Sequence, residues 1–209
     1  FLPGLPGSGG TITDFSGNGN HGTISGATWA NLSTGLWVLS FDGTDDYVTI
    51  PDSDILDIGT SDFTLEGWFK APDTAGLYGF IMGKNSAISP HYGLWIADTG
   101  KLYFEIYDGT ANLSKSSTTA WDDNLWHHFA IPFDRDGNAV IYVDGVADGT
   151  LDISTAFRTL ASGGNFFIGQ RGDSANFFTG KVGIVRIYNR ALTAGVIANI
   201  FNQERHLWS

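Results

Sequence analysis

The sequence predicts an all-β protein: a two-sheet antiparallel sandwich or jelly roll with one short C-terminal helix. Segments in which apolar and polar residues alternate recur along most of the chain, as strands with one buried face do. Turn-forming residues separate these segments, because the chain has 28 glycines and Glu occurs only at positions 66, 105 and 204 among its 22 acidic residues. Aromatic residues make up 14% of the 209 residues, which is enough to fill a core between two sheets.

The alternation predicts ten strands in a single domain, residues 11–209. Residues 1–10 are rich in Pro and Gly without an apolar period, and they predict a flexible arm or linker. We expect the strands at 36–41, 47–50, 63–70, 77–83, 91–97, 101–107, 126–133, 139–143, 165–169 and 181–188.

The end of the chain carries the one helical pattern. Thr193 is placed to cap a helix, because Val196, Ile197, Ile200 and Phe201 follow at helical spacing. We expect this helix to pack against the sandwich.

Charge and composition exclude several functional classes. The chain has 11 Lys and Arg against 22 Asp and Glu, a net charge of −11. Such a chain is poorly suited to displace counterions from nucleic acid or to dock on anionic lipid. No apolar run approaches the roughly 18 residues of a membrane helix, and the absence of Cys excludes disulfides and thiolate metal sites. We therefore expect no nucleic-acid partner and no membrane insertion.

Four segments spanning residues 14–193 carry a resemblance to a known family. They are DFSGNGNHGTISGATW (14–29), LSFDGTDDYVTIP (39–51), FTLEGWFK (63–70) with WHHFAIPFDRDGNAVIYVDG (126–145), and FTGKVGIVRIYNRALT (178–193). Together they resemble the laminin-G-like jelly-roll family of the concanavalin A-like lectin/glucanase superfamily. The resemblance implies two antiparallel sheets, an extracellular, cell-surface or virion-surface setting, and non-catalytic binding of glycans or proteins.

Two loops predict a structural calcium site. Oxygen-bearing side chains stand at every second position from residue 14 to residue 20, and Ca²⁺ takes six to eight oxygen ligands. The resemblance implies a calcium near this loop and the FDGTDD loop, so the predicted ligands are Asp14, Asn18, Asn20, Asp42, Asp45 and Asp46. The alternative is that Asp14 and Asn18 only form Asx-turns. Relatives commonly have an acidic pair where this chain has Gly183-Ile184, which weakens the site if that pair contributes to it.

Alternating residues in four strands also predict a ligand-binding face. Aromatic rings stack on the C–H surfaces of sugars, and carboxylate and guanidinium groups bond to sugar hydroxyls. The predicted face contains Trp68, Trp95, Tyr103, Glu105, Tyr107 and Arg186. The alternative is that loops or the terminal helix cover these residues and make them a second core.

The sequence gives little support for catalysis. Jelly-roll glucanases carry carboxylates two residues apart on one strand, whereas Glu66 and Glu105 have no acidic neighbour at that spacing. Asp134 and Asp136 lie in a turn, although an acid pair assembled from distant loops stays an alternative. His127 and His128 are adjacent in a strand and point to opposite faces, which favours a structural role.

We therefore expect a non-catalytic glycan-binding module stabilised by calcium. The alternative is a structural or decoration subunit of a virion, tail fibre or cell-surface filament. In that case residues 1–10 would be a connector, and the protein would assemble with itself.

Overall fold

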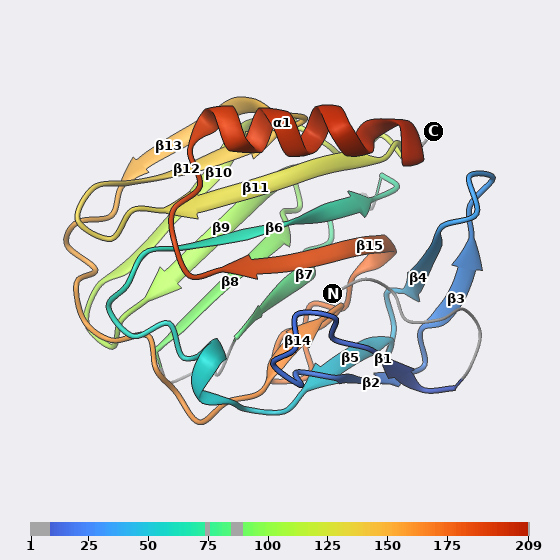
Figure 1. Ribbon diagram of the computed structural model, residues 1–209, viewed down its shortest axis with the longest axis horizontal. Helices are drawn as coiled ribbons and strands as arrows, with labels where there is room; N and C mark the ends of the chain where they lie inside the picture. Colours follow the sequence, from blue (N-terminus) through green and yellow to red (C-terminus); the bar gives the residue numbers. More distant parts are fainter. Residues whose placement is uncertain (1–8, 74–75, 85–89, 209) are drawn as a thin grey trace.

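The computed structural model describes residues 9–73, 76–84 and 90–208, which form two stacked antiparallel sheets and one α-helix (Figure 1). The eight-stranded sheet contains, in spatial order, β1 (Thr11–Ile12), β2 (Gly22–Ser25), β5 (Tyr47–Ile50), β14 (Phe166–Ile168), β7 (Gly79–Lys84), β8 (His91–Ile96), β9 (Lys101–Tyr107) and β10 (Asn112–Ala120). The seven-stranded sheet contains β13 (Val146–Asp152), β12 (Asn138–Val143), β11 (His127–Phe133), β6 (Phe63–Lys70), β15 (Thr179–Tyr188), β4 (Trp37–Asp42) and β3 (Thr28–Asn31). The predicted jelly-roll sandwich is confirmed.

The main core lies between the two sheets. Strands β9 and β12 alternate between buried and half-buried residues, and Phe104 and Val185 are buried as their positions predict. The central strands β6, β7, β8 and β11 are buried on both faces for almost their whole length. A second layer of side chains therefore covers the outer face of each sheet at its centre.

Helix α1 (Ala194–Glu204) supplies that second layer on the seven-stranded sheet (Figure 1). Thr193 is its N-cap residue, as predicted, although its side chain makes no capping hydrogen bond. Ile197 is buried against Ala130, whereas Val196 is 38% exposed and faces away from the sheet. The four apolar residues therefore do not form one buried stripe, because only part of the helix circumference meets the sheet.

The residues after α1 extend this outer layer. They form η2 (Arg205–Leu207) and lead to Trp208, whose ring stacks on Trp68 at a centroid distance of 4.9 Å. A Cβ atom on Gly183 would lie 2.1 Å from the Trp208 ring. Ile184 packs in the same cluster. Gly183 therefore leaves room for the Trp208 ring, and Ile184 packs beside it.

Five strands were not predicted from the sequence, namely β1, β2, β3, β10 and β13. The last two are mostly polar edge strands, so they lack the apolar alternation by which a strand is recognised. Asp148 on β13 joins them across the sheets, because its carboxylate accepts 3.2 Å hydrogen bonds from the N–H groups of Thr118 and Thr119 on β10. Residues 1–8 of the predicted arm lie outside the described residues.

Candidate functional site

A cavity of about 520 Å³ opens where the end of β15 meets two loops. We call it the β15 cavity. Its apolar wall includes Phe15, Ile55 and Ile58, and its polar groups include Asn18, Asn189 and Arg186. Phe15 and Ile55 are more than half exposed, so they are free to contact a ligand.

Strand pairing explains why the cavity forms at this point. Strand β4 pairs with β15 only from Thr179 to Val182, whereas β6 pairs with β15 as far as Tyr188. The last residues of β15 therefore have β6 on one side and border the cavity.

The wall that carries Ile55 is the short helix η1 (Asp54–Leu56). The buried ammonium group of Lys84 forms ion pairs with Asp52 at 2.5 Å and with Asp57, on either side of η1. The Tyr92 hydroxyl donates a 2.8 Å hydrogen bond to the carbonyl of Leu56. This wall is thus fastened to the core at three points.

The opposite wall is the loop 14–20, and Asp14 holds it in shape. The Asp14 carboxylate accepts hydrogen bonds from the Ser16 N–H at 2.8 Å, the Ser16 hydroxyl at 2.9 Å and the Asn20 N–H at 2.9 Å. Burial alone would raise the pKa of Asp14, but these hydrogen bonds outweigh it and hold the pKa below its ordinary value. Asp14 is therefore ionised at neutral pH and forms an Asx-turn.

Behind Arg186 lies a buried ionic group that we call the Glu66 network: Glu66, His128, Arg186, Tyr188 and Glu204. The Arg186 guanidinium donates to both Glu66 oxygens at 3.0 and 2.8 Å and to Glu204 at 2.6 Å. His128 Nε2 lies 3.0 Å from Glu66 Oε1. The Tyr188 hydroxyl donates to Glu66 at 3.3 Å.

Electrostatics fix the charges of this network. Burial would raise the pKa of Glu66, but the His128 hydrogen bond and the Arg186 charge lower it below its ordinary value. Burial and the nearby Glu66 charge raise the pKa of Tyr188 to about 12, so its hydroxyl keeps its proton. Glu66 is therefore a buried carboxylate that depends on its neighbours for its charge.

The six predicted ligand-binding residues do not share one face, because their strands belong to different sheets. Trp68 and Arg186 lie on the seven-stranded sheet, and the other four lie on β8 and β9 of the eight-stranded sheet. Trp68 is sealed between Trp208 and Phe201, and its N–H donates to Glu204 at 2.8 Å. Alternation along a strand identifies its two faces but not the sheet to which it belongs, which is why the single face was wrong.

Trp95, Tyr103, Glu105 and Tyr107 do come together on the outer face of β8 and β9, with His91 beside them. Trp95 is only 3% exposed, because its ring packs between Phe80 and Tyr103. Glu105 lies 3.0 Å from His91 Nε2 and accepts a 3.2 Å hydrogen bond from the Tyr103 hydroxyl. This face is mostly packed on itself.

Two further groups near that face, His91 and Arg171, were not among the predicted binding residues. His91 stands four residues before Trp95 on β8, so alternation along the strand puts both side chains on the same face and could have identified His91. Arg171 lies close enough for the charge of Glu105 to help raise its pKa, after the larger effect of its hydrogen bond to Asp173. Arg171 could not be placed from sequence, because it lies in the loop after β14.

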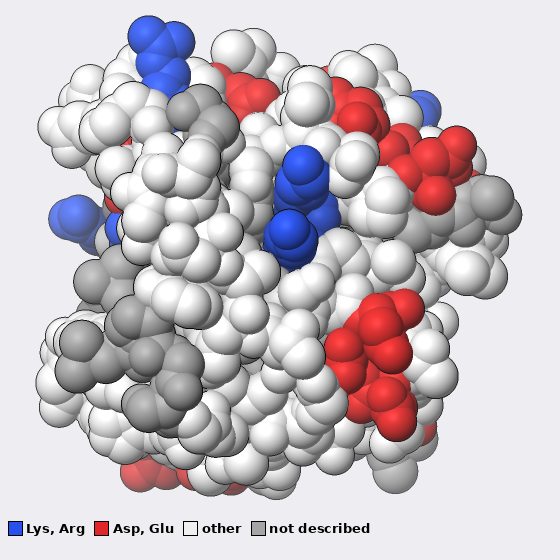
Figure 2. All heavy atoms as spheres, turned by 90° about the vertical axis from the view of Figure 1, so that its right-hand side faces the viewer, with Lys and Arg blue, Asp and Glu red and all other residues white. Residues whose placement is uncertain are grey.

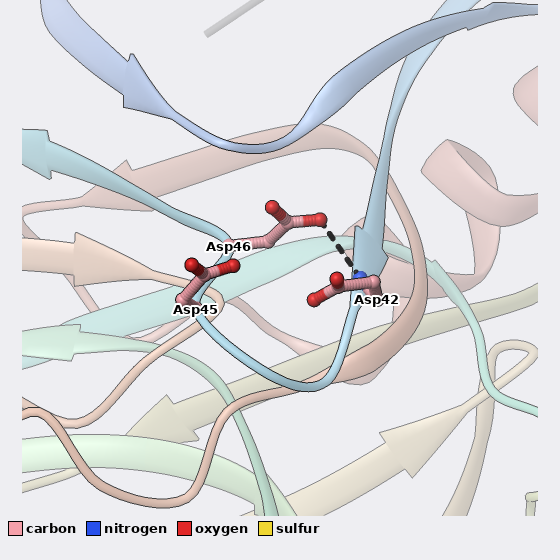
Figure 3. Close-up of side chains that lie close together, drawn as sticks. All are labelled: Asp42, Asp45 and Asp46. Carbon is pink, nitrogen blue, oxygen red and sulfur yellow. Dashed lines mark hydrogen bonds between the residues drawn. The ribbon is translucent and has the colours of Figure 1, made fainter.

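The predicted metal residues are divided between two places. The carboxylate oxygens of Asp42, Asp45 and Asp46 lie within 4.8 Å of one another (Figure 3). We call these three residues the aspartate cluster. Asp14 lies outside this group and, with Asn18 and Asn20, borders the β15 cavity.

Within the aspartate cluster the Asp42 N–H donates to Asp46 at 2.8 Å, the bond drawn in Figure 3. Asp46 is buried, and the other two are exposed. Burial raises the pKa of Asp46, and the charges of Asp42 and Asp45 raise it further. A cation would relieve this repulsion.

The remaining polar residues singled out from sequence have structural partners. His127 lies between Asp144 and Asp123 at 2.9 and 3.0 Å, on the opposite face of β11 from His128. The two histidines therefore cannot bind one metal ion together. Asp134 and Asp136 form a second acidic group with Asp62 at the surface.

A family profile described as the concanavalin A-like lectin/glucanases superfamily matches residues 42–198. The chain belongs to this superfamily. No curated protein sequence matches the chain.

Solved structures of toxin binding domains have the same fold. The binding domain of Paraclostridial Mosquitocidal Protein 1 has a TM-score of 0.77 at 16% identity, over 94% of this chain and 52% of that one. The botulinum neurotoxin serotype G binding domain has a TM-score of 0.76 at 16% identity, over 92% and 48%. The serotype D ligand binding domain in complex with N-acetylneuraminic acid has a TM-score of 0.79 at 13% identity, over 97% and 50%. The chain thus spans about half the length of these structures.

The surface of this superfamily member is unevenly charged. On the face drawn in Figure 2, acidic side chains gather in several groups, whereas the basic side chains are few. Within the described ranges, no helix has both the length and the apolar character needed to cross a membrane.

Proposed function

We propose that this jelly-roll chain is a non-catalytic glycan-binding module that acts outside the cell or at a surface, and that the β15 cavity is its site. One observation carries the proposal: the cavity combines exposed apolar side chains with amide, carboxylate and guanidinium groups. Its volume of about 520 Å³ falls in the range of small-molecule sites.

The chemistry of the cavity suits a sugar. A pyranose ring has an apolar C–H face, which Phe15 and Ile55 can cover. Its hydroxyls both donate and accept hydrogen bonds, and the side-chain amides of Asn18 and Asn189 do the same. The cavity therefore offers a partner to each kind of surface that a sugar presents.

The same residues argue against hydrolysis. Canonical glycoside hydrolysis needs two carboxyl groups that flank the scissile bond. Among the described residues that line the cavity, Asp14 is the one acid, and it is occupied by its own loop. Glu66 is fully buried behind Arg186. We therefore propose binding without bond cleavage.

Replacing Phe15 with Ala is expected to weaken binding to immobilised oligosaccharides about fivefold to tenfold, because an aromatic contact of about 1–1.4 kcal/mol is lost. The measurement is a glycan array of neutral and acidic oligosaccharides, followed by titration with the strongest binder. Phe157→Ala is the matched control, since Phe157 is 66% exposed and lies outside the cavity. Equal losses in both variants, or no binding by the wild-type chain, would overturn the proposal.

The structural neighbours support a binding role without naming the ligand. One neighbour, a botulinum neurotoxin serotype D domain, was solved in complex with N-acetylneuraminic acid, and another, of botulinum neurotoxin DC, in complex with rat synaptotagmin II. This chain covers only about half of those domains, so the comparison supports a glycan and a surface protein equally as partners. Self-assembly into a larger particle stays a prediction.

We also propose that the aspartate cluster holds a structural Ca²⁺. Two oxygens bound to one calcium at about 2.4 Å can lie at most about 4.8 Å apart, and carboxylate oxygens of Asp42, Asp45 and Asp46 all lie within 4.8 Å of one another. Their oxygens are the hard ligands that Ca²⁺ prefers. The residues present therefore fit the ion, which would tie the β4–β5 turn together.

Calcium is expected to raise the melting temperature by about 5–10 °C at a concentration a hundredfold above its Kd. A ligand bound only to the native state then adds about 2.7 kcal/mol, and each kcal/mol moves the melting point of a chain this size by about 2–4 °C. The measurement is thermal unfolding in calcium and in chelator. The Asp42→Asn, Asp45→Asn double variant should lose the shift, and an unchanged wild-type melt would count against the site.

A further inference from the structure

We infer that the β15 cavity selects uncharged sugar residues and discriminates against acidic ones such as sialylated or sulfated sugars. This inference rests on the proposed function and specifies its ligand class. It is carried by the two charged residues of the cavity lining, Asp14 and Arg186, and by the two carboxylates that pair with Arg186.

Arg186 is the one cationic residue among the described residues that line the cavity, and it is not available as a free positive charge. Its guanidinium donates to both oxygens of Glu66 and to Glu204, and its side chain is only 27% exposed. An acidic sugar would have to compete with two carboxylates that are already in place. Such competition is unfavourable, because a displaced Glu66 would be left as a buried, uncompensated charge.

The charges of Arg186, its two carboxylate partners and Asp14 together sum to a negative value. Arg186 contributes +1, whereas Glu66, Glu204 and Asp14 each contribute −1. The sum stays negative whether or not His128 carries a proton. The hydrogen bonds that lower the pKa of Asp14 keep that carboxylate charged at the cavity wall. A carboxylate or sulfate entering the cavity would therefore meet like charge, which opposes binding.

The arrangement favours a hydroxyl-rich, uncharged ligand for the same reason. A sugar hydroxyl can accept a hydrogen bond from Arg186 without displacing an ion pair, and it brings no negative charge toward Asp14. The apolar side chains of Phe15, Ile55 and Ile58 are indifferent to charge and bind the ring face. Selectivity thus comes from the polar side of the cavity and affinity from the apolar side.

The test uses an array in which each uncharged oligosaccharide is printed beside its sialylated and sulfated forms. At low ionic strength we expect at least tenfold stronger binding of the uncharged form. The ratio of uncharged to acidic binding should fall toward one as the salt concentration rises, because added ions screen the repulsion between the acidic sugar and the cavity. Glu204→Gln should also lower this ratio, since this variant removes one negative charge and leaves Arg186 less fully paired.

Glu105→Gln is the matched control, because it makes the same chemical change on the eight-stranded sheet, away from the cavity. Its ratio of uncharged to acidic binding should equal that of the wild type. Equal or stronger binding of acidic forms by the wild type, lost on Phe15→Ala, would overturn the selectivity while leaving glycan binding in the cavity intact. An array with no binding at all would overturn the proposed function and this inference with it.

Discussion

Replacing Arg186 with Met is expected to lower the free energy of unfolding by about 3 kcal/mol at neutral pH. The variant keeps most of the apolar stem but leaves Glu66, which is fully buried, without its cationic partner. Breaking a buried ion pair in this way costs about 3–5 kcal/mol, and the low end applies because the adjoining cavity admits water. The measurement is urea unfolding. Thermal unfolding should show the same loss as a fall in melting temperature of roughly 6–12 °C.

The loss should shrink in acid, and its sign follows from the pKa of Glu66. In the wild-type chain this pKa is lowered below its ordinary value of 4.5, so the ionised group stabilises the fold above pH 4.5. That stabilisation disappears as the pH falls through the lowered folded-state pKa. The two chains should therefore approach each other in stability below about pH 4.5.

A second substitution separates the charge from the packing. The Arg186→Met, Glu66→Gln double variant removes both charges, so it should recover part of the lost stability. A single Arg186→Met variant as stable as the wild type at pH 7 would contradict the structural role of the pair.

Replacing Gly183 with Ala is expected to cost about 3–5 kcal/mol, the range for losing a buried Trp side chain. The added Cβ would lie 2.1 and 2.3 Å from two ring atoms of Trp208, and that ring stacks on Trp68 and packs against Trp126. Gly183 lies in an irregularity of β15, but Val182 and Val185 on either side of it both pair with β6, so we expect the Trp208 ring rather than the strand to move. The expected readout is a changed near-UV signal from the tryptophans together with lower stability in urea.

The helix supplies a control for this variant. Gly195 lies in α1, and a Cβ there meets no atom within 4 Å. Gly195→Ala should therefore stabilise the protein by about 0.5–1 kcal/mol, because Ala is the better helix former. In a Trp208→Ala background, Gly183→Ala should cost much less, and full additivity of the two losses would show that the clash is not the cause.

Most strands could be predicted from the sequence because the alternation of apolar and polar residues is a local pattern within each strand. The alternation of apolar and polar residues in 101–107 and 139–143 can be recognised within each segment alone, and both segments form strands with alternating burial. Strands β10 and β13 escaped prediction because an edge strand exposed to water has no apolar period to detect.

The site was harder to predict because it depends on which segments meet. The alternation of Trp68 and Trp95 gave each its face, but pairing placed the two residues in different sheets. The loop 14–20 could be recognised as oxygen-rich, whereas its position beside β15 could not. Asp14 was therefore predicted for a metal and lies at the wall of a cavity that also contains Arg186.

The long span of the Glu66 network has a consequence for how the chain acquires its fold. Glu66 pairs with Arg186, which lies 120 residues later in the chain. Trp68 donates to Glu204, which lies 136 residues later. Contacts so distant in sequence form slowly, because the entropy cost of closing a large loop must be met before the contacts stabilise the fold. During synthesis the middle of the seven-stranded sheet therefore stays incomplete until β15 and the residues near 204 have emerged.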